Sequence, residues 1–218
     1  MLFFKNKKFV GFLLIILVLL LSGCGENSSK LESVNIELYQ ADYMVGDINV
    51  SVIYPVVSAE EETNVVVEKL NQQFQTDVER FIEFVADKYV GHEHINESFS
   101  YKADVLYNQD GMISIVQEQQ CGDDYYQYAA TYSLADGKKM SMGELLDMNE
   151  NEAQETVIKQ FGGIIQSYPD AFNTDAGDYI SQHIDEVQYY RYSEGLGVFF
   201  PVGTIADAEQ GVQEMVMQ

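Results

Sequence analysis

Residues 65–90 read VVVEKLNQQFQTDVERFIEFVADKYV, and this stretch decides the fold. Its apolar side chains recur at spacings of three and four: Val66, Leu70, Phe74, Val78, Phe81, Val85 and Tyr89. That spacing places them on one stripe of a helix whose other sides are polar. Ser58 and Glu61 have the spacing of a capping box, and Gly91 follows as a stop signal. The sequence therefore predicts an amphipathic helix over about 59–90, long enough at about 1.5 Å per residue to cross a sheet.

The segments on both sides of this helix alternate apolar and polar residues with the period of two that strands have. Before it, strands are predicted over 34–43 and 48–54, joined by Gly46-Asp47 and ended by Tyr54-Pro55. After it, an antiparallel meander of three strands is predicted over 99–107, 112–119 and 126–134. Asn108-Gln109-Asp110-Gly111 is the turn signal between the first two strands of that meander.

The C-terminal third predicts further helices and short strands. Ser141 and Glu144 form a second capping box. Helices are predicted over 150–166 and 176–185, and Gly162-Gly163 weakens the first by about 1 kcal/mol per glycine relative to alanine, so a break there is an alternative. The remaining predicted strands are 188–192, 196–200 and 212–217. This order predicts an α+β fold, an antiparallel sheet with a long helix and two or three further helices packed on one face.

The N-terminus has the features of a bacterial lipoprotein signal. Three lysines precede an uncharged apolar run over 9–21. Leu21-Ser22-Gly23-Cys24 stands at the end of this run. This order is typical of a secretory signal peptide with a small-residue cleavage site, and the last four residues have the form of a lipobox. We expect a signal peptide over 1–23, a lipidated Cys24 with a flexible tether over 24–33, and a single domain over 34–218.

The expected lipid would hold the protein at the extracytoplasmic face of the cell membrane. A diacylglyceryl group supplies two acyl chains, which anchor stably where one chain does not. An uncleaved transmembrane segment is one alternative, but the apolar run is shorter than the roughly 20 residues that a span needs. Plain secretion after cleavage at Gly23 is the other alternative, and it would leave an exposed thiol on Cys24.

The charge argues against nucleic-acid binding. The chain has 35 Asp and Glu against 12 Lys and Arg, a net charge of −23, and loss of the three lysines in residues 1–23 makes it −26. Proteins that bind nucleic acids need a basic surface that displaces counterions from phosphates. An acidic surface keeps a protein soluble, and it can also attract basic proteins or cations.

Cysteine usage leaves no intramolecular disulfide. The chain has two cysteines, so lipidation of Cys24 leaves Cys121 alone. Exported proteins often rely on disulfides, and here the hydrophobic core has to hold the fold instead. We expect Cys121 to be a small buried apolar residue rather than a nucleophile.

Several segments together resemble a known family. They are Val52–Val56 before the long helix, Tyr125–Leu134 continuing into Asp136–Leu146, and Gly195–Pro201 followed by Ile205-Ala206 and Gly211. Over most of residues 36–217 the chain resembles the RsiV-like domain family of bacterial extracytoplasmic proteins. That family includes the ectodomain of the RsiV anti-sigma factor and the non-catalytic domain of the PdaC peptidoglycan deacetylase. Asp207 departs from the family pattern, which usually has proline there.

The resemblance implies an α+β domain that binds or senses something at the cell envelope, as the RsiV ectodomain binds lysozyme. An anti-sigma role needs a cytoplasmic domain before the membrane segment, and only eight residues precede the apolar run here, so we do not expect that role. Nothing in the sequence resembles a deacetylase catalytic domain. We therefore expect a stand-alone binding module and no enzyme.

Candidate catalytic and metal-binding residues are few. His92-Glu93-His94 offers two histidines, and two ligands do not make a metal site. Asn173, Asp175 and Asp178 lack the glycine and glutamate of an EF-hand loop, which leaves irregular calcium binding as the alternative. The acids of Asp123-Asp124 are expected to be solvated. The sequence predicts no catalytic residue, no metal and no cofactor.

Tyrosines give the clearest signal for binding. They gather in two runs, 125–132 and 189–192, and neighbours on a strand point to opposite faces. Each run must expose some rings unless both faces are covered. Tyrosine is enriched at protein interfaces, and its ring suits stacking against sugars. The predicted binding residues are Tyr125, Tyr126, Tyr128, Tyr190 and Tyr192.

These residues predict a binding or sensing module whose ligand is a basic protein such as lysozyme, or a cell-wall glycan. Two alternatives stay open from the sequence. One is a cell-wall hydrolase that uses a pair of carboxylates, and the other is an accessory subunit of an envelope complex.

Overall fold

The computed structural model of the chain describes residues 31–60, 64–92 and 97–217. The first half contains β1 (Asn35–Val45), β2 (Ile48–Ser58), α1 (Val65–Lys88), β3 (Phe99–Gln109), β4 (Met112–Cys121) and β5 (Asp124–Ser133). The second half contains α2 (Met142–Leu146), α3 (Glu150–Ser167), α4 (Ala176–Gln182), β6 (Gln188–Tyr192), β7 (Gly195–Phe199) and β8 (Glu214–Met217). Short 3-10 turns lie at Pro169–Ala171, Ile184–Glu186 and Ala208–Gln210.

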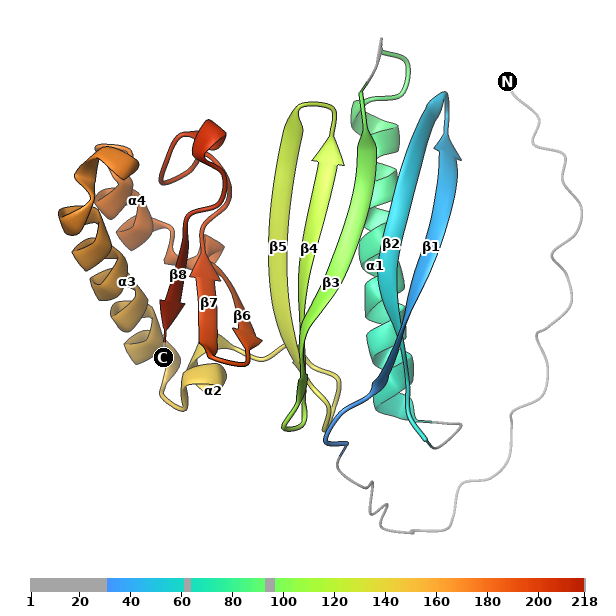
Figure 1. Cartoon of the computed structure of the whole chain (residues 1–218), viewed down its shortest axis with the longest axis horizontal. Coiled ribbons are helices and arrows are strands. Elements are labelled where there is room, and N and C mark those ends of the chain that lie inside the picture. The colour runs from blue at the N-terminus through green and yellow to red at the C-terminus, as the bar shows by residue number, and fades with distance from the viewer. Residues whose placement is uncertain (1–30, 61–63, 93–96, 218) are drawn as a thin grey trace, which may run out of the picture.

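The first half forms a five-stranded sheet in the order β1-β2-β3-β4-β5. Its neighbouring pairs are antiparallel except for β2 and β3, which are parallel because α1 carries the chain back along the sheet between them. Figure 1 shows α1 running along the strands behind this sheet. The helix buries most of the predicted stripe, but Val67 is buried in place of Val66, and Tyr89 is the half-buried C-cap. The buried helical residues are Val67, Leu70, Phe74, Val78, Phe81 and Val85.

The long helix begins later than the sequence predicts. Asn64 is its N-cap, and the side-chain oxygen of Asn64 accepts hydrogen bonds from the backbone N–H groups of Val66 and Val67 at 3.0 and 3.3 Å. Ser58 is the last residue of β2, so the predicted capping box of Ser58 with Glu61 is wrong, and Glu61 lies outside the described residues. Asparagine satisfies the unpaired N–H groups of a first helical turn as well as serine does.

The second strand also differs from its prediction, since it passes through Pro55 and ends at Ser58. β3 pairs with β2 only over Val50–Ile53, so beyond Ile53 the strand has β1 as its neighbour on one side alone. A proline cannot donate to a central ladder, and a stretch with one free side accommodates it.

The turn between β3 and β4 confirms the prediction made from its residues. Asp110 and Gly111 join the strands, and both have positive φ values, 56° and 73°. These are the conformations of the two-residue hairpin turns that Asp-Gly favours. The predicted capping box of Ser141 with Glu144 is also confirmed, with both of its reciprocal hydrogen bonds present.

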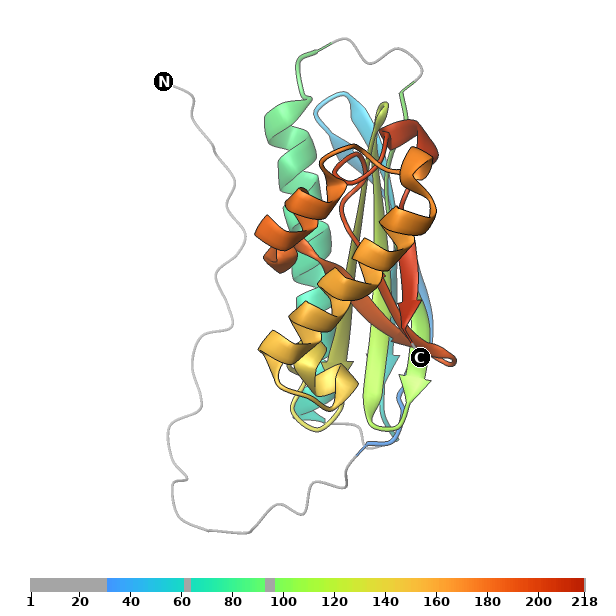
Figure 2. The ribbon, with the colours of Figure 1, turned by 90° about the vertical axis from the view of Figure 1, so that its left-hand side faces the viewer.

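The second half builds a separate sheet, β6-β7-β8, in which both pairs are antiparallel. α3 runs unbroken through Gly162-Gly163 and packs with α4 around a second core. Figures 1 and 2 show α3 and α4 on the side of this small sheet that faces away from the five-stranded sheet. The predicted α+β class is confirmed, while the helices are shared between two sheets rather than gathered on one face of one sheet.

The two sheets meet on the face of β4 and β5 opposite to α1. Ser114 and Thr131 are fully buried there, with their hydroxyl oxygens 2.6 Å apart. The backbone N–H of Arg191 in β6 donates to both oxygens, at 3.0 and 3.1 Å. Apolar side chains from both sheets complete this inter-sheet seam: Val116, Ala129, Tyr190 and Phe199. Polar groups that are buried need such partners, so the hydroxyl pair fixes where β6 crosses the larger sheet.

Cys121 is expected to resist thiol reagents in the folded protein. Its side chain is 1% exposed in the core under α1, as the sequence predicts, and burial raises its pKa to about 11. The thiolate is the reactive form, so at pH 8 Ellman's reagent should label Cys121 slowly in native protein and fully in urea. The protein for this measurement would carry Cys24→Ser, and rapid labelling without denaturant would contradict the buried placement.

The N-terminal predictions lie outside the described residues. They are the signal peptide over 1–23, Cys24 and the first part of the tether. His94, which follows the long helix, also lies outside the described residues. Across 31–60, 64–92 and 97–217, no helix is both long and apolar enough to span a membrane.

Candidate functional site

A pocket of about 360 Å³ lies between α1 and the β4–β5 edge of the five-stranded sheet. Four of its lining residues come from α1, two from β4 and two from β5: Asp77, Arg80, Phe81, Phe84, Gln117, Gln119, Tyr126 and Tyr128. The helical residues lie on one face because they are three or four positions apart. The strand residues share a face because they are two positions apart. The same periodicities that build the core therefore build this pocket at its edge.

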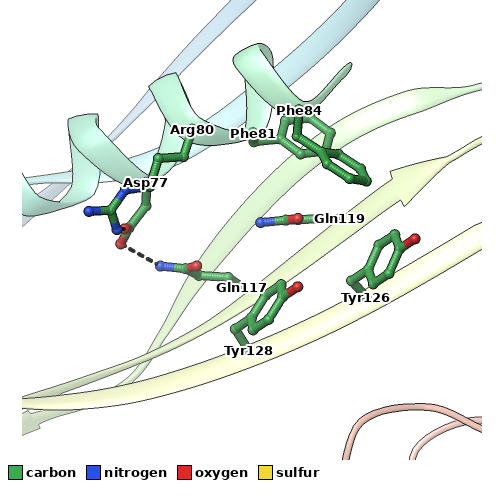
Figure 3. Close-up of a pocket in the computed structure, with 8 residues that line it drawn as sticks. All are labelled: Asp77, Arg80, Phe81, Phe84, Gln117, Gln119, Tyr126 and Tyr128. Atoms are coloured by element: carbon green, nitrogen blue, oxygen red, sulfur yellow. Dashed lines mark hydrogen bonds and ion pairs between the residues drawn. The ribbon is translucent and has the colours of Figure 1, made fainter. Parts of the chain in front are cut away.

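The strand register places each tyrosine of the pocket opposite a glutamine. Tyr126 pairs with Gln119 and Tyr128 pairs with Gln117 across the antiparallel β4–β5 ladder. Figure 3 shows the two tyrosine rings along β5 and the two amides between them and the helix. The ring of Phe84 on the helix meets the ring of Tyr126 edge to face, with centroids 5.9 Å apart. The pocket thus combines aromatic walls with a floor of neutral amides.

The charged groups at the helix side of the pocket are bound to one another or to amides. Gln73 and Gln117 each donate to one oxygen of the Asp77 carboxylate, at 2.9 and 3.0 Å. A guanidinium nitrogen of Arg80 lies 3.5 Å from the first of these oxygens. The Asp77 side chain is 15% exposed and the Arg80 side chain 70% exposed, so the acid lies inside and the base at the rim.

A second charge pair lies at the far end of the pocket. Lys88 lies 3.3 Å from the Asp124 carboxylate and donates to the Tyr126 hydroxyl at 3.4 Å. The Tyr89 hydroxyl donates to the same Asp124 oxygen at 2.7 Å. These donors, Tyr89 first and Lys88 next, hold the pKa of Asp124 below its usual range. Both ends of the pocket therefore carry paired charges.

A buried hydroxyl lies close to the floor of the pocket. Tyr101 is 1% exposed, and its ring packs on Phe81 with centroids 5.7 Å apart. Its oxygen has no hydrogen-bond partner among the described residues. Burial first, and the charge of Asp77 second, raise the pKa of Tyr101. Tyr101 therefore belongs to the apolar core behind Phe81, one of the lining residues.

The structure separates the five predicted binding tyrosines into three groups. Tyr126 and Tyr128 line the pocket, and Tyr128 is 42% exposed. Tyr125 lies on the other face of the same strand, where burial and Glu118 raise its pKa to about 12. Tyr190 and Tyr192 pack in the inter-sheet seam, and Tyr190 is 9% exposed with its hydroxyl bonded to Glu214.

The other candidates from the sequence do not gather into a site. His92, Asp123 and Asp178 are exposed, and none of them lines the pocket. Within the described parts of the chain, no group of three or more His, Cys, Asp and Glu side chains could hold a metal ion. Asp175 and Asp178 are exposed and belong to no such group.

Most residues of the pocket were not predicted from the sequence, although the sequence carries a signal for them. On β4, the face that carries Ile113 and Ile115 in the core continues with Gln117 and Gln119. Gln117 and Gln119 occupy strand positions that the period of two assigns to the buried, apolar face. Amides at such positions indicate that the apolar core ends there and a polar cavity begins. Asp77 interrupts the apolar stripe of α1 at the same level, as its bond to Gln117 shows.

Comparison with known proteins identifies similar folds only. No protein-family model matches the sequence, and no curated protein matches it. A crystal structure of a member of the DUF3298 family from Bacteroides fragilis has a TM-score of 0.57 at 9% identity, covering 85% of this chain and 90% of that chain. A crystal structure of a DUF3298 family protein from Pseudomonas aeruginosa has a TM-score of 0.50 at 12% identity, covering 84% of this chain and 89% of that chain. The chain therefore shares its fold with solved structures of DUF3298 family proteins.

Proposed function

We propose that this chain is a non-enzymatic binding module of the bacterial cell envelope, with its ligand in the pocket between α1 and the β4–β5 edge. In this proposal, lipid on Cys24 anchors the module to the extracytoplasmic face of the cell membrane. The ligand is a component of the envelope or a protein that acts on it.

The observation that carries the proposal is the pocket itself. Its volume of about 360 Å³ falls within the range of about 300–1,000 Å³ that ligand pockets have. Aromatic walls with a few convergent polar groups are the usual composition of such sites. Tyr126 and Tyr128 were predicted as binding residues from the sequence, and both line it.

The arrangement favours binding over hydrolysis. Glycoside hydrolases place two carboxyl groups across the scissile bond, about 5–9.5 Å apart. Among the eight residues that line the pocket, Asp77 alone carries a carboxylate, and its two oxygens accept bonds from Gln73 and Gln117. A carboxylate held in this way is poorly placed to attack a substrate or to activate water.

The proposed location of the protein at the cell membrane is inferred from its sequence. The lipobox ending at Cys24 supports export and lipidation, and the net charge of −26 after cleavage gives an acidic domain that anionic headgroups would repel. The resemblance to the RsiV-like family supports a role at the envelope. Replacing Cys24 with serine should abolish labelling by radioactive palmitate in growing cells and release the protein from membranes, and labelling that persists would contradict the lipid anchor.

The binding function is tested with residues 25–218, which contain every described element. The domain is mixed with insoluble peptidoglycan and, separately, with immobilised cationic lysozyme. We expect the domain to be retained by at least one of these, and Tyr128→Ala to reduce the retained fraction at least tenfold. Tyr125→Ala is the matched control, because Tyr125 lies on the same strand but faces away from the pocket. Equal retention of both variants, or retention by neither material, would contradict the proposal.

A further inference from the structure

Building on the proposed function, we infer that the ligand of the pocket is a neutral saccharide, stacked on Tyr126 and Tyr128 and hydrogen-bonded by the Gln117 and Gln119 amides. The competing occupant of the same pocket is a cationic side chain of a basic protein. The net charge of −23 would favour the cationic side chain. The charges next to the pocket, rather than the net charge of the chain, decide between the saccharide and the cation.

The local charge of the pocket is balanced. The Asp77 carboxylate is bound by two amides and lies beside the Arg80 guanidinium. At the far end, Lys88 and Asp124 form the second pair. A lysine or arginine that enters the pocket would approach the positive charge of Arg80, whose side chain is 70% exposed at the rim. It would find no unpaired carboxylate among the lining residues. A buried cation needs such a partner.

The polar groups left without a partner are neutral. Among the described residues, no hydrogen bond engages the Gln119 amide or the Tyr128 hydroxyl, and the Gln117 amide uses only its N–H group, on Asp77. These groups offer one N–H₂ donor, two carbonyl acceptors and a hydroxyl. Sugar hydroxyls both donate and accept, so they match this set, whereas an ammonium or guanidinium group can only donate.

The aromatic residues supply the second half of a sugar site. Tyr126 and Tyr128 are two positions apart on β5, which spaces them by roughly 6.8 Å along the strand. Aromatic rings offer flat apolar surfaces against which the C–H face of a pyranose can pack. The volume of about 360 Å³ is at the small end of the range for ligand pockets, which suits a ligand of one or two sugar rings.

The test is calorimetric titration of residues 25–218 with neutral disaccharides, N,N′-diacetylchitobiose, cellobiose and maltose, and with hexalysine. We expect at least one disaccharide to bind, with a Kd that does not change with salt, because a neutral ligand has no charge to screen. Gln119→Leu, which removes the amide at similar volume, should weaken that binding at least tenfold. Gln127→Leu is the matched control, since Gln127 lies on β5 on the face away from the pocket.

The outcomes of the titrations separate failure of the saccharide inference from failure of the proposed function. Binding of hexalysine that Gln119→Leu or Tyr128→Ala weakens, without binding of any disaccharide, would overturn the saccharide inference and leave the binding function standing. If Gln119→Leu and Tyr128→Ala both bind the disaccharide as tightly as the unaltered domain does, the saccharide inference and the pocket as the binding site are both overturned. Urea unfolding of each variant shows that a loss of binding is not a loss of folding.

Discussion

Replacing Tyr190 with alanine is expected to lower the free energy of unfolding by about 3–5 kcal/mol, as buried aromatic residues do when they are truncated. The Tyr190 ring is 9% exposed and lies directly on Gly197, where an added Cβ would be 2.6 Å from the ring. Its hydroxyl donates to Glu214 at 2.6 Å. The substitution would therefore open a cavity in the inter-sheet seam and leave the Glu214 carboxylate without its donor.

Urea unfolding followed by far-ultraviolet circular dichroism measures this effect. Tyr168→Ala is the control, because Tyr168 is 67% exposed and should change stability by less than about 0.5 kcal/mol. A loss below 1 kcal/mol for Tyr190→Ala would contradict the account of the seam. The expected loss is a large part of the roughly 5–15 kcal/mol that stabilises a domain.

Removing both pocket tyrosines should have the largest effect on ligand binding. For Tyr126→Ala with Tyr128→Ala we expect the Kd for the saccharide to rise about 100-fold, which is about 2.7 kcal/mol. This loss corresponds to roughly 1.4 kcal/mol for each ring, within the range of about 0.5–1.5 kcal/mol for aromatic contacts beyond their area burial. Tyr128 is exposed, so its loss should cost little stability, and Tyr126 gives up its contact with Phe84.

The matched control for the double variant is Tyr125→Ala, on the opposite face of β5. Its Kd should stay within twofold of that of the unaltered domain. Titration calorimetry gives both values, and unfolding in urea checks that the double variant is folded under the conditions of the titration. If the double variant binds as tightly as the control, the two rings do not hold the ligand.

The elements that follow simple periodicities could be predicted from the sequence. The spacing of Leu70, Phe74, Val78 and Phe81 specifies the buried face of α1, and Asp110-Gly111 specifies the hairpin. Local chemistry alone settles these features. The start of α1 was placed too early because Ser58 and Glu61 imitate a capping box, while the cap that forms is Asn64.

The division into two sheets could not be predicted in the same way. It depends on contacts between residues distant in the sequence, such as the Arg191 N–H with Ser114 and Thr131. A period of two shows that a strand has a buried face, but it does not show which sheet covers that face. For this reason the sequence grouped Tyr190 and Tyr192 with Tyr126 as binding residues, whereas the structure places them in the inter-sheet seam.

Only part of the pocket could be predicted from the sequence. Its tyrosines stood out, but its amides did not, because a glutamine in a strand is usually solvated. Only the register of β4 against β5 and the packing of α1 bring Gln117 and Asp77 together. Sequence reasoning can identify such a floor when polar residues occupy the core-facing positions of a strand that is otherwise buried.

The proposed ligand of the pocket between α1 and the β4–β5 edge is a neutral saccharide. Nuclear magnetic resonance of the ¹⁵N-labelled domain, titrated with the disaccharide that binds in calorimetry, locates the binding site of that disaccharide. The side-chain amide signals of Gln117 and Gln119 should shift together with the backbone signals of Tyr126 and Tyr128, while the Gln127 amide stays in place. Shifts confined to other surfaces of the domain, with the Gln117 and Gln119 amides unmoved at saturation, would contradict the account.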